Sequence, residues 1–233
     1  MNLGTLRPVL AELVGTFLFV LAGTMSVVAN AGTNSGLGVV GVALAHGVAL
    51  SVLVTATMNI SGGHLNPAVT AGMMLVRRID LKTGGLYIAA QLLGAVIASL
   101  VVKGVLPFGA VNATSGGTPQ LSSHIGWPQA FVLEALFTFF LVSAIFGTAV
   151  SAEAPKVGGF GIGLAVFVAA VTIGPYTGAA LNPARAFGPA LVFKEWHTQG
   201  WYWIGPIVGA ALAALLWDKV LLRPKADPVT PRL

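Results

Sequence analysis

The 233-residue chain has no cysteine and very few charged residues. Without cysteine it can form no disulfide, no thiolate metal site and no thiol nucleophile. Only 8% of its residues are charged, against roughly 25% in soluble domains, whereas 56% are hydrophobic. So few charges cannot cover a soluble globule of this size. The apolar side chains must therefore face lipid, which predicts an all-α membrane protein.

The sequence lacks the patterns expected for nucleic-acid binding, metal binding and catalysis. The basic residues behind the net charge of +5 are scattered between hydrophobic stretches, and only Arg77 and Arg78 are adjacent, which indicates membrane topology and not nucleic-acid binding. The chain has no His-Glu-x-x-His zinc pattern, and no Ser/His arrangement suggests a catalytic site. We therefore expect no metal, no cofactor and no enzymatic activity.

Six apolar stretches are long enough to cross a bilayer, which takes about 20 residues per helix. They cover residues 9–29, 38–58, 86–106, 128–150, 157–176 and 201–222. Two further apolar segments, residues 66–76 and 182–193, are about half that length, and each begins with Asn-Pro-Ala. These two segments are too short to span, and we expect each to form a half-helix.

The Asn-Pro-Ala triplets explain how the half-helices begin. The two triplets are Asn66-Pro67-Ala68 and Asn182-Pro183-Ala184. Asparagine is a good helix N-cap, and proline suits the first helical position. The irregular backbone that precedes each triplet is tolerated at membrane depth only beside protein or a water-filled cavity. The pattern therefore predicts two broken segments in the interior of the bundle.

The same features occur twice, which indicates an internal duplication. Glu12 is matched by Glu134 and Asn66 by Asn182, at offsets of 134 − 12 = 122 and 182 − 66 = 116. Each half contains an odd number of spans, so the second half must enter the membrane from the opposite side. We expect one channel domain over residues 1–233, formed by inverted repeats at about 1–120 and 121–233.

The distribution of lysine and arginine predicts the orientation. A cytoplasmic N-terminus leaves Lys103 and Lys194 outside. The same choice places nine basic residues inside: Arg7, Arg77, Arg78, Lys82, Lys156, Lys219, Arg223, Lys225 and Arg232. We therefore expect a multi-pass protein of the cell (inner or plasma) membrane with both termini in the cytoplasm.

Two half-helices that meet head to head direct two positive helix ends and two amide groups at one point near the bilayer centre. Cations should be repelled there. A neutral molecule with lone pairs can accept hydrogen bonds from Asn66 and Asn182, and the irregular loops offer carbonyl oxygens. The alternative is that both asparagines are only helix caps. Their occurrence at matching places in the two halves favours the pore.

The chain resembles the aquaporins of the major intrinsic protein family over nearly its whole length. The resemblance rests on four motifs: SGGHLNPAVT from Ser61, NPAR from Asn182, AFGP from Ala186 and WIGP from Trp203. It implies six tilted helices and two half-helices in a right-handed bundle, a pore in each subunit, and a homotetramer. It also implies a passive channel for water that excludes ions and protons.

In this family an outer filter of four residues forms the narrowest point of the pore. The resemblance places it at His46, Ala170, Ala179 and Arg185. Water-specific members generally combine Phe, His and a small residue with the Arg, whereas glycerol channels use Trp, Gly and Phe. Two alanines should widen the filter here, although residues such as Ala186 and Ala190 resemble the water branch. We expect fast water flux and slower passage of solutes of the glycerol, urea or ammonia class.

Three further polar residues are candidates for roles near the pore. His64 lies just before the first triplet and is expected to line the inner vestibule, with a structural role in its loop as the alternative. Glu12 and Glu134 are expected to accept hydrogen bonds from the irregular loops, and the alternative is a proton relay. A proton relay would suit an ion-coupled secondary transporter of a small neutral solute, which is the competing function.

Overall fold

The computed structural model describes residues 3–32 and 36–222, and these residues form only helices, turns and loops. Among the described residues, six helices are long and apolar enough to cross a membrane. The six are α1 (Leu3–Gly32), α2 (Gly38–Ser61), α4 (Leu81–Val105), α6 (Trp127–Ile145), α7 (Phe160–Thr177) and α9 (Trp201–Leu216). The prediction of an all-α protein with six spans is confirmed.

Three shorter helices complete the described fold: α3 (Pro67–Leu75), α5 (Phe108–Ala113) and α8 (Pro183–Phe193). Both predicted half-helices are present as α3 and α8. The helix α5 and the 3-10 turn at Ser115–Gly117 lie between the third and fourth spans, outside the segments predicted to be helical. Val111 of α5 packs against Val28 and Val102, so this outer segment is held by apolar contacts with α1 and α4.

The ends of several spans differ from the sequence prediction. Helix α1 begins before Pro8, which is accommodated near the N-terminus of the helix. Helix α4 begins at Leu81 because the side chain of Asp80 accepts a hydrogen bond from the Thr83 amide at 3.0 Å. Helices α6 and α9 each continue into a π-helical turn, at Phe146–Val150 and Trp217–Leu221.

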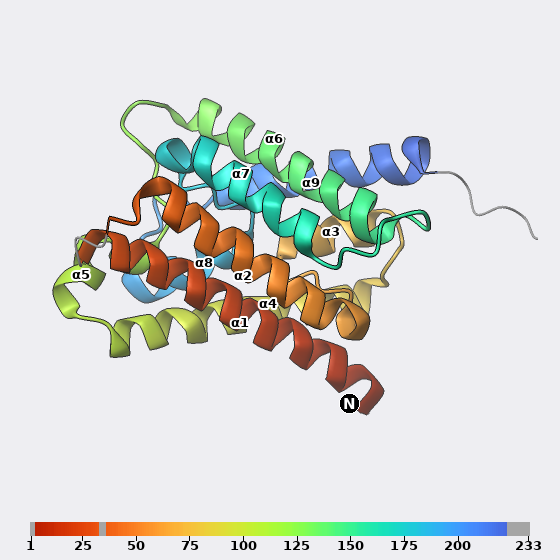
Figure 1. The fold of residues 1–233 in the computed structure, drawn as a ribbon, viewed down its shortest axis with the longest axis horizontal. Coiled ribbons are helices and arrows are strands. Elements are labelled where there is room, and N and C mark those ends of the chain that lie inside the picture. Colours follow the sequence, from red (N-terminus) through yellow and green to blue (C-terminus); the bar gives the residue numbers. More distant parts are fainter. Residues whose placement is uncertain (1–2, 33–35, 223–233) are drawn as a thin grey trace, which may run out of the picture.

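The long helices lie roughly side by side, and α3 and α8 are enclosed between them (Figure 1). Helix α1 packs against α2 and α4, α2 packs against α7, and α6 packs against α9. The two half-helices lie toward opposite ends of the bundle and contact each other (Figure 1). The start of α1 and the end of the described chain lie at the same end of the bundle (Figure 1). Three of the basic residues used to predict orientation, Arg223, Lys225 and Arg232, lie outside the described residues.

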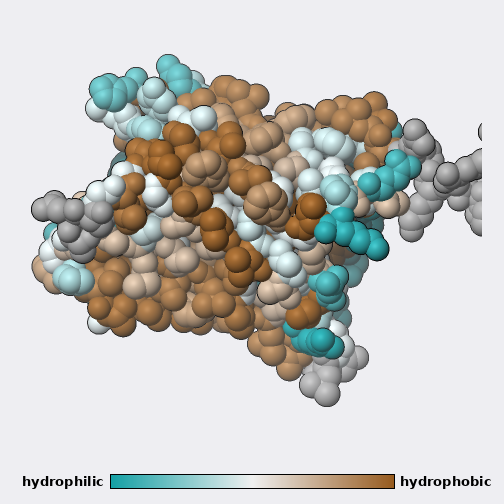
Figure 2. Space-filling model, viewed as in Figure 1, coloured by the Kyte–Doolittle hydropathy of each residue, from teal (hydrophilic) through white to brown (hydrophobic). Residues whose placement is uncertain are grey.

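The surface has the character expected of a protein in lipid. Hydrophobic residues cover the middle of the visible face, and hydrophilic residues gather at its two ends (Figure 2). Large apolar side chains such as Val40 on α2 and Leu136 on α6 are more than half exposed. Such extensive apolar exposure is rare on soluble proteins and is expected where acyl chains are the solvent.

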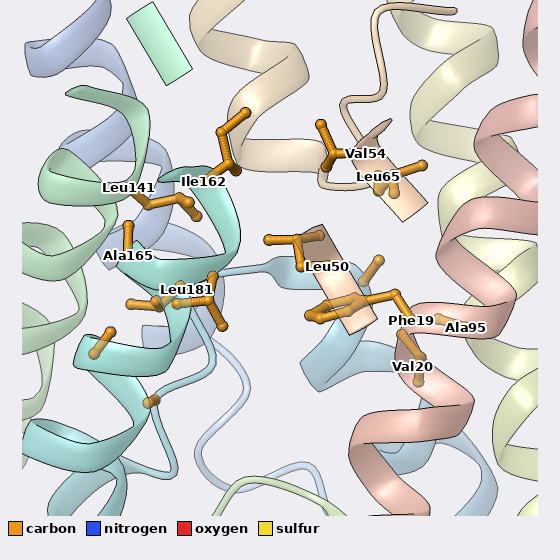
Figure 3. Close-up of a cluster of buried hydrophobic side chains, with 14 of the residues drawn as sticks. Phe19, Val20, Leu50, Val54, Leu65, Ala95, Leu141, Ile162, Ala165 and Leu181 are labelled. Atoms are coloured by element: carbon orange, nitrogen blue, oxygen red, sulfur yellow. The ribbon is translucent and has the colours of Figure 1, made fainter. Parts of the chain in front are cut away.

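The largest buried apolar cluster lies in the middle of the bundle. Its members come from α1, α2, α4, α6, α7, α8 and the loops before the half-helices. Figure 3 shows side chains from both sides of the bundle directed toward the centre, among them Phe19, Leu50, Val54, Leu141, Ile162 and Leu181. These same six residues line a narrow internal cavity, so the cluster forms the apolar wall of the site described next.

Candidate functional site

Three cavities follow one another through the centre of the molecule. The outer cavity has a volume of about 340 Å³ and the inner cavity about 270 Å³. Between them lies a waist of about 20 Å³. One water molecule needs about 10–15 Å³ of such space, so the waist has room for only one or two water molecules. The waist shares His46, Ala179 and Arg185 with the outer cavity, and Gly63 and His64 with the inner one.

The N-termini of the two half-helices meet at the waist. Asn66 is extended, with φ −159°, and its side-chain oxygen accepts from the Ala68 amide at 2.8 Å. Asn182 is also extended, with φ −149°, and accepts from the Ala184 amide at 3.0 Å. Each asparagine therefore caps its half-helix, with the following proline in the first helical turn. Both side chains line the waist.

Each asparagine amide also reaches across to the other half of the chain. Asn66 Nδ2 donates to the Leu181 carbonyl, and Asn182 Nδ2 donates to the Leu65 carbonyl, both at 2.9 Å. An amide nitrogen carries two N–H donors, so one donor on each side chain is not used by these bonds. The cross-bonds fix both amide planes and leave a second N–H on each asparagine for a molecule in the waist.

The two leucines that accept these bonds have an unusual backbone. Leu65 and Leu181 have φ values of 49° and 51°, in the left-handed region that non-glycine residues seldom adopt. Such strain persists only where neighbouring contacts hold it in place. Here the strain aims each carbonyl at the asparagine of the opposite half-helix.

Glu12 holds the first of these loops. Its Oε2 accepts from the Leu65 amide at 2.7 Å, and its Oε1 accepts from the His64 amide at 2.9 Å and from the Ser61 hydroxyl at 2.6 Å. The side-chain amide of Gln91 donates to Oε2 at 2.7 Å. The carboxylate is fully buried, and these four donors compensate its transfer from water.

Glu134 has the equivalent contacts in the second half. It accepts from the Leu181 amide at 2.7 Å, the Ala180 amide at 3.0 Å and the Thr177 hydroxyl at 2.7 Å. It is fully buried as well. Both carboxylates are thus surrounded by donors from the irregular loops, and neither is among the residues that line the described cavities.

Arg185 lies where the waist opens into the outer cavity. Its side chain is buried, with 3% of the residue surface exposed. Nη1 donates to the Gly117 carbonyl at 2.8 Å, and Nη2 lies 3.5 Å from Nε2 of His46. A guanidinium has five N–H donors, so others stay available toward the cavity.

The contacts of His46 define its tautomer. Nδ1 lies 2.9 Å from the Val42 carbonyl, which can only accept, so Nδ1 carries the proton. Nε2 then presents a lone pair to Arg185. The ring of Phe19 meets the imidazole edge-on, with centroids 6.2 Å apart.

The four residues expected to form the outer filter are brought together, but they are not equivalent. All four line the outer cavity. His46, Ala179 and Arg185 also line the waist, whereas Ala170 lines only the outer cavity. The small side chain of Ala170 therefore adds room above the waist. The imidazole and the guanidinium lie at the waist itself.

His64 lines both the waist and the inner cavity, and two residues that sequence reasoning missed hold its ring. The Thr70 hydroxyl donates to the Asn66 carbonyl at 3.0 Å, so it can only accept from Nδ1 of His64, 3.1 Å away. Gln91 Nε2 donates to the same hydroxyl oxygen at 3.0 Å. Gln91 therefore links Glu12 to Thr70 through hydrogen bonds from its side-chain amide.

Two other contributors were also missed. The Gly117 carbonyl, in the outer segment, is an acceptor for Arg185, and no sequence pattern marks a backbone oxygen. Arg78 lines the inner cavity and donates to Asp218 at 2.7 Å. Arg78 and Asp218 are 140 positions apart, so nothing in the sequence indicated this ion pair.

The described residues thus form a helical membrane bundle in which two half-helices meet at a narrow waist between two wider cavities, and this arrangement is that of a channel. The chain matches the family model "Major intrinsic protein" over residues 1–217. The chain belongs to this family, the aquaporins, which are passive channels for water and small solutes and not enzymes.

Individual relatives agree with this assignment. The chain is 40% identical to Aquaporin TIP4-4 of Zea mays over 98% of its own length and 92% of the relative. It is 42% identical to Aquaporin TIP1-2 of Musa acuminata, over 94% and 88% of the two chains. The solved structure of the aquaglyceroporin from Plasmodium falciparum superposes with a TM-score of 0.81 at 25% identity, covering 93% of this chain and 97% of that one.

Proposed function

We propose that this chain is a bidirectional water channel that also admits small neutral solutes of the glycerol, urea or ammonia class and excludes ions and protons. The observation that carries the proposal is the series of cavities, with a waist of about 20 Å³ between two wider vestibules. In the waist, a water molecule meets amide donors from Asn66 and Asn182 against an apolar wall.

Ion exclusion follows from the charges around this passage. The N-termini of α3 and α8 direct their positive helix ends at the waist, and Arg185 adds a full positive charge where the waist meets the outer cavity. A water molecule that accepts from both asparagines donates its own hydrogens outward, which interrupts a proton relay. In this proposal the Asn-Pro-Ala residues, Pro67, Ala68, Pro183 and Ala184 included, serve to place the donors.

Solute selectivity is assigned to the outer filter of His46, Ala170, Ala179 and Arg185. Ala170 and Ala179 leave one wall of the outer cavity without bulky side chains. His46 and Arg185 supply polar groups at the entrance to the waist. This combination of a roomy vestibule with a polar waist favours fast water flux with slower flux of small hydroxylated or amide solutes. His64 is assigned to the inner vestibule.

The wider organisation is part of the same proposal. We take residues 1–233 as one channel domain built from inverted repeats at about 1–120 and 121–233. We take the functional form as a homotetramer in the cell membrane, with both termini cytoplasmic. The lack of charge in the outer segment and the basic residues at the other end of the bundle support this orientation.

Stopped-flow light scattering of proteoliposomes tests the function. Water flux should be fast in both directions, with a low activation energy and no dependence on membrane potential. Gradients of urea and glycerol should dissipate more slowly, without saturation. An ion-coupled transporter would instead concentrate its solute at the expense of an ion gradient, and such uptake would reject the channel. No carboxylate is found among the described residues that line the three cavities, which argues against ion coupling.

A further inference from the structure

Gly23 of α1 lies directly behind the imidazole of His46. A Cβ atom at residue 23 would be 2.5 Å from Nε2 and 2.7 Å from Cδ2 of that ring. A real Cβ atom essentially never lies within 3.0 Å of an atom to which it is not bonded, so the ring occupies the space that a side chain at residue 23 would need. Gly23 is buried, and the three nearest atoms to this Cβ position all belong to His46.

The ring stands between Gly23 and the pore. His46 lines both the outer cavity and the waist, whereas Gly23 lines neither. A side chain at residue 23 would therefore push the imidazole away from α1 and toward the cavities. Nε2, the atom nearest to the missing Cβ, is also the atom that faces Arg185 at 3.5 Å.

The next residue of α1 supports the second acceptor of Arg185 in a similar way. Gly117 has φ +78°, and a Cβ there would be 3.0 Å from both Cα and the carbonyl oxygen of Thr24. The Gly117 backbone thus packs closely on α1 and presents its carbonyl to Arg185. Adjacent residues on one turn of α1 contact both groups that hold the guanidinium.

We propose that Gly23 is a positioning residue of the outer filter. Because residue 23 has no side chain, the imidazole of His46 can pack against α1. In this position the ring contacts Arg185 and lines the passage without blocking it. Gly23 thereby sets the aperture for solutes larger than water without contacting them. This inference rests on the proposed function for its transport consequence, but not for the position of the ring.

The test is Gly23→Ala in the full-length chain, with Gly104→Ala as the matched control. Gly104 is also helical and has no atoms within 4 Å of its Cβ position. Solid-state NMR of protein labelled with ¹⁵N-histidine in proteoliposomes reports the ring, and His46→Ala identifies its signals. Gly23→Ala should shift the His46 nitrogen signals and leave those of His64 in place. Unchanged His46 signals would overturn the inference.

Transport provides the second measurement. Gly23→Ala should lower the urea-to-water permeability ratio by about tenfold, the order by which one methylene changes discrimination in a closed pocket. Adding Gly23→Ala to His46→Ala should have no further effect, because no ring is left to displace. A shifted ring with an unchanged ratio would support the positioning role and count against the proposed filter role of His46.

Failure of Gly23→Ala to fold is also informative. If the double variant Gly23→Ala/His46→Ala then folds, the clash is with the imidazole, as inferred. If the double variant fails as well, Gly23 is required for helix packing and the inference is wrong.

Discussion

The side-chain amide of Asn66 donates a hydrogen bond to the carbonyl of Leu181, 115 positions further along the chain. The reciprocal bond joins Asn182 to Leu65. Each asparagine therefore caps its own half-helix and also forms a hydrogen bond to the loop that precedes the other half-helix. The consequence for transport is that both donors in the waist are held in fixed orientations by backbone atoms and not by mobile side chains.

Replacement of the filter arginine should open the channel to ions. Arg185→Val removes the full charge beside the waist while the helix ends and the asparagines remain. Two unit charges about 4 Å apart repel by about 4 kcal/mol at an effective dielectric of about 20, so the cation or proton leak should rise by about three orders of magnitude. Water flux should persist.

Proteoliposomes that contain a pH-sensitive dye and are held at an imposed potential measure the leak. Lys103→Val removes one positive charge from an exposed site on α4 and should remain tight. If Arg185→Val is as tight as the unmodified protein, the half-helix ends supply nearly the whole barrier.

A larger side chain in the wall of the outer cavity should reduce the flux of urea and glycerol more than the flux of water. Ala170→His fills space above the waist, where Ala170 lines the outer cavity only. Urea and glycerol permeability should fall several-fold more than water permeability, as measured by stopped-flow scattering in the same vesicles. Equal proportional losses for water and solutes would place the selective constriction elsewhere.

Mercurials should not inhibit the unmodified channel, because the chain has no cysteine. Ala179→Cys should introduce inhibition, since Ala179 lines both the outer cavity and the waist and a bound mercury atom would fill the passage. Most of the water flux should be lost and then recovered with excess thiol. Ala152→Cys, exposed in the loop before α7, is the control and should stay insensitive. Prompt inhibition of the cysteine-free protein would contradict the prediction.

Neutralisation of a buried carboxylate should cost stability. Glu12 accepts from four donors, and in Glu12→Gln an NH₂ group must face some of them. An unsatisfied buried polar group costs about 1–3 kcal/mol, so the free energy of unfolding should fall by at least that amount. Thermal or SDS unfolding in detergent, followed by tryptophan fluorescence, measures the change.

Glu134→Gln should also lower the free energy of unfolding. Glu153→Gln, at an exposed position, is the control and should change it little. A proton relay predicts a different pattern. In that case Glu12→Gln would keep its stability and lose a proton-coupled flux.

Much of this architecture follows from local sequence patterns. The six spans are hydrophobic runs, and the half-helices are marked by an N-cap asparagine and a proline, which are signals within a few residues. The prediction that Asn66 and Asn182 cap these helices needed no tertiary information. The ends of α1 and α4 were less predictable, because polar residues at a membrane surface continue a helix as readily as apolar ones.

The remaining features depend on contacts between distant segments. The acceptors of the asparagine amides are backbone carbonyls, which have the same chemistry at every residue. Only the offset 181 − 65 = 116, equal to that between the two asparagines, distinguishes Leu65 and Leu181 in the sequence. The support of Arg185 by Gly117 depends on how an uncharged outer segment folds onto α1, and no motif encodes that packing.

The cross-bonds also bear on the order in which the protein is made. Glu12 lies in the same half as the loop that it stabilises, so this loop can be shaped as soon as the first half has entered the membrane. The acceptor of Asn66 does not yet exist at that time, because Leu181 is synthesised 115 residues later. The Asn66 amide therefore gains this acceptor only after Leu181 has been synthesised, so the hydrogen-bonded centre of the channel cannot form before the second half has entered the membrane.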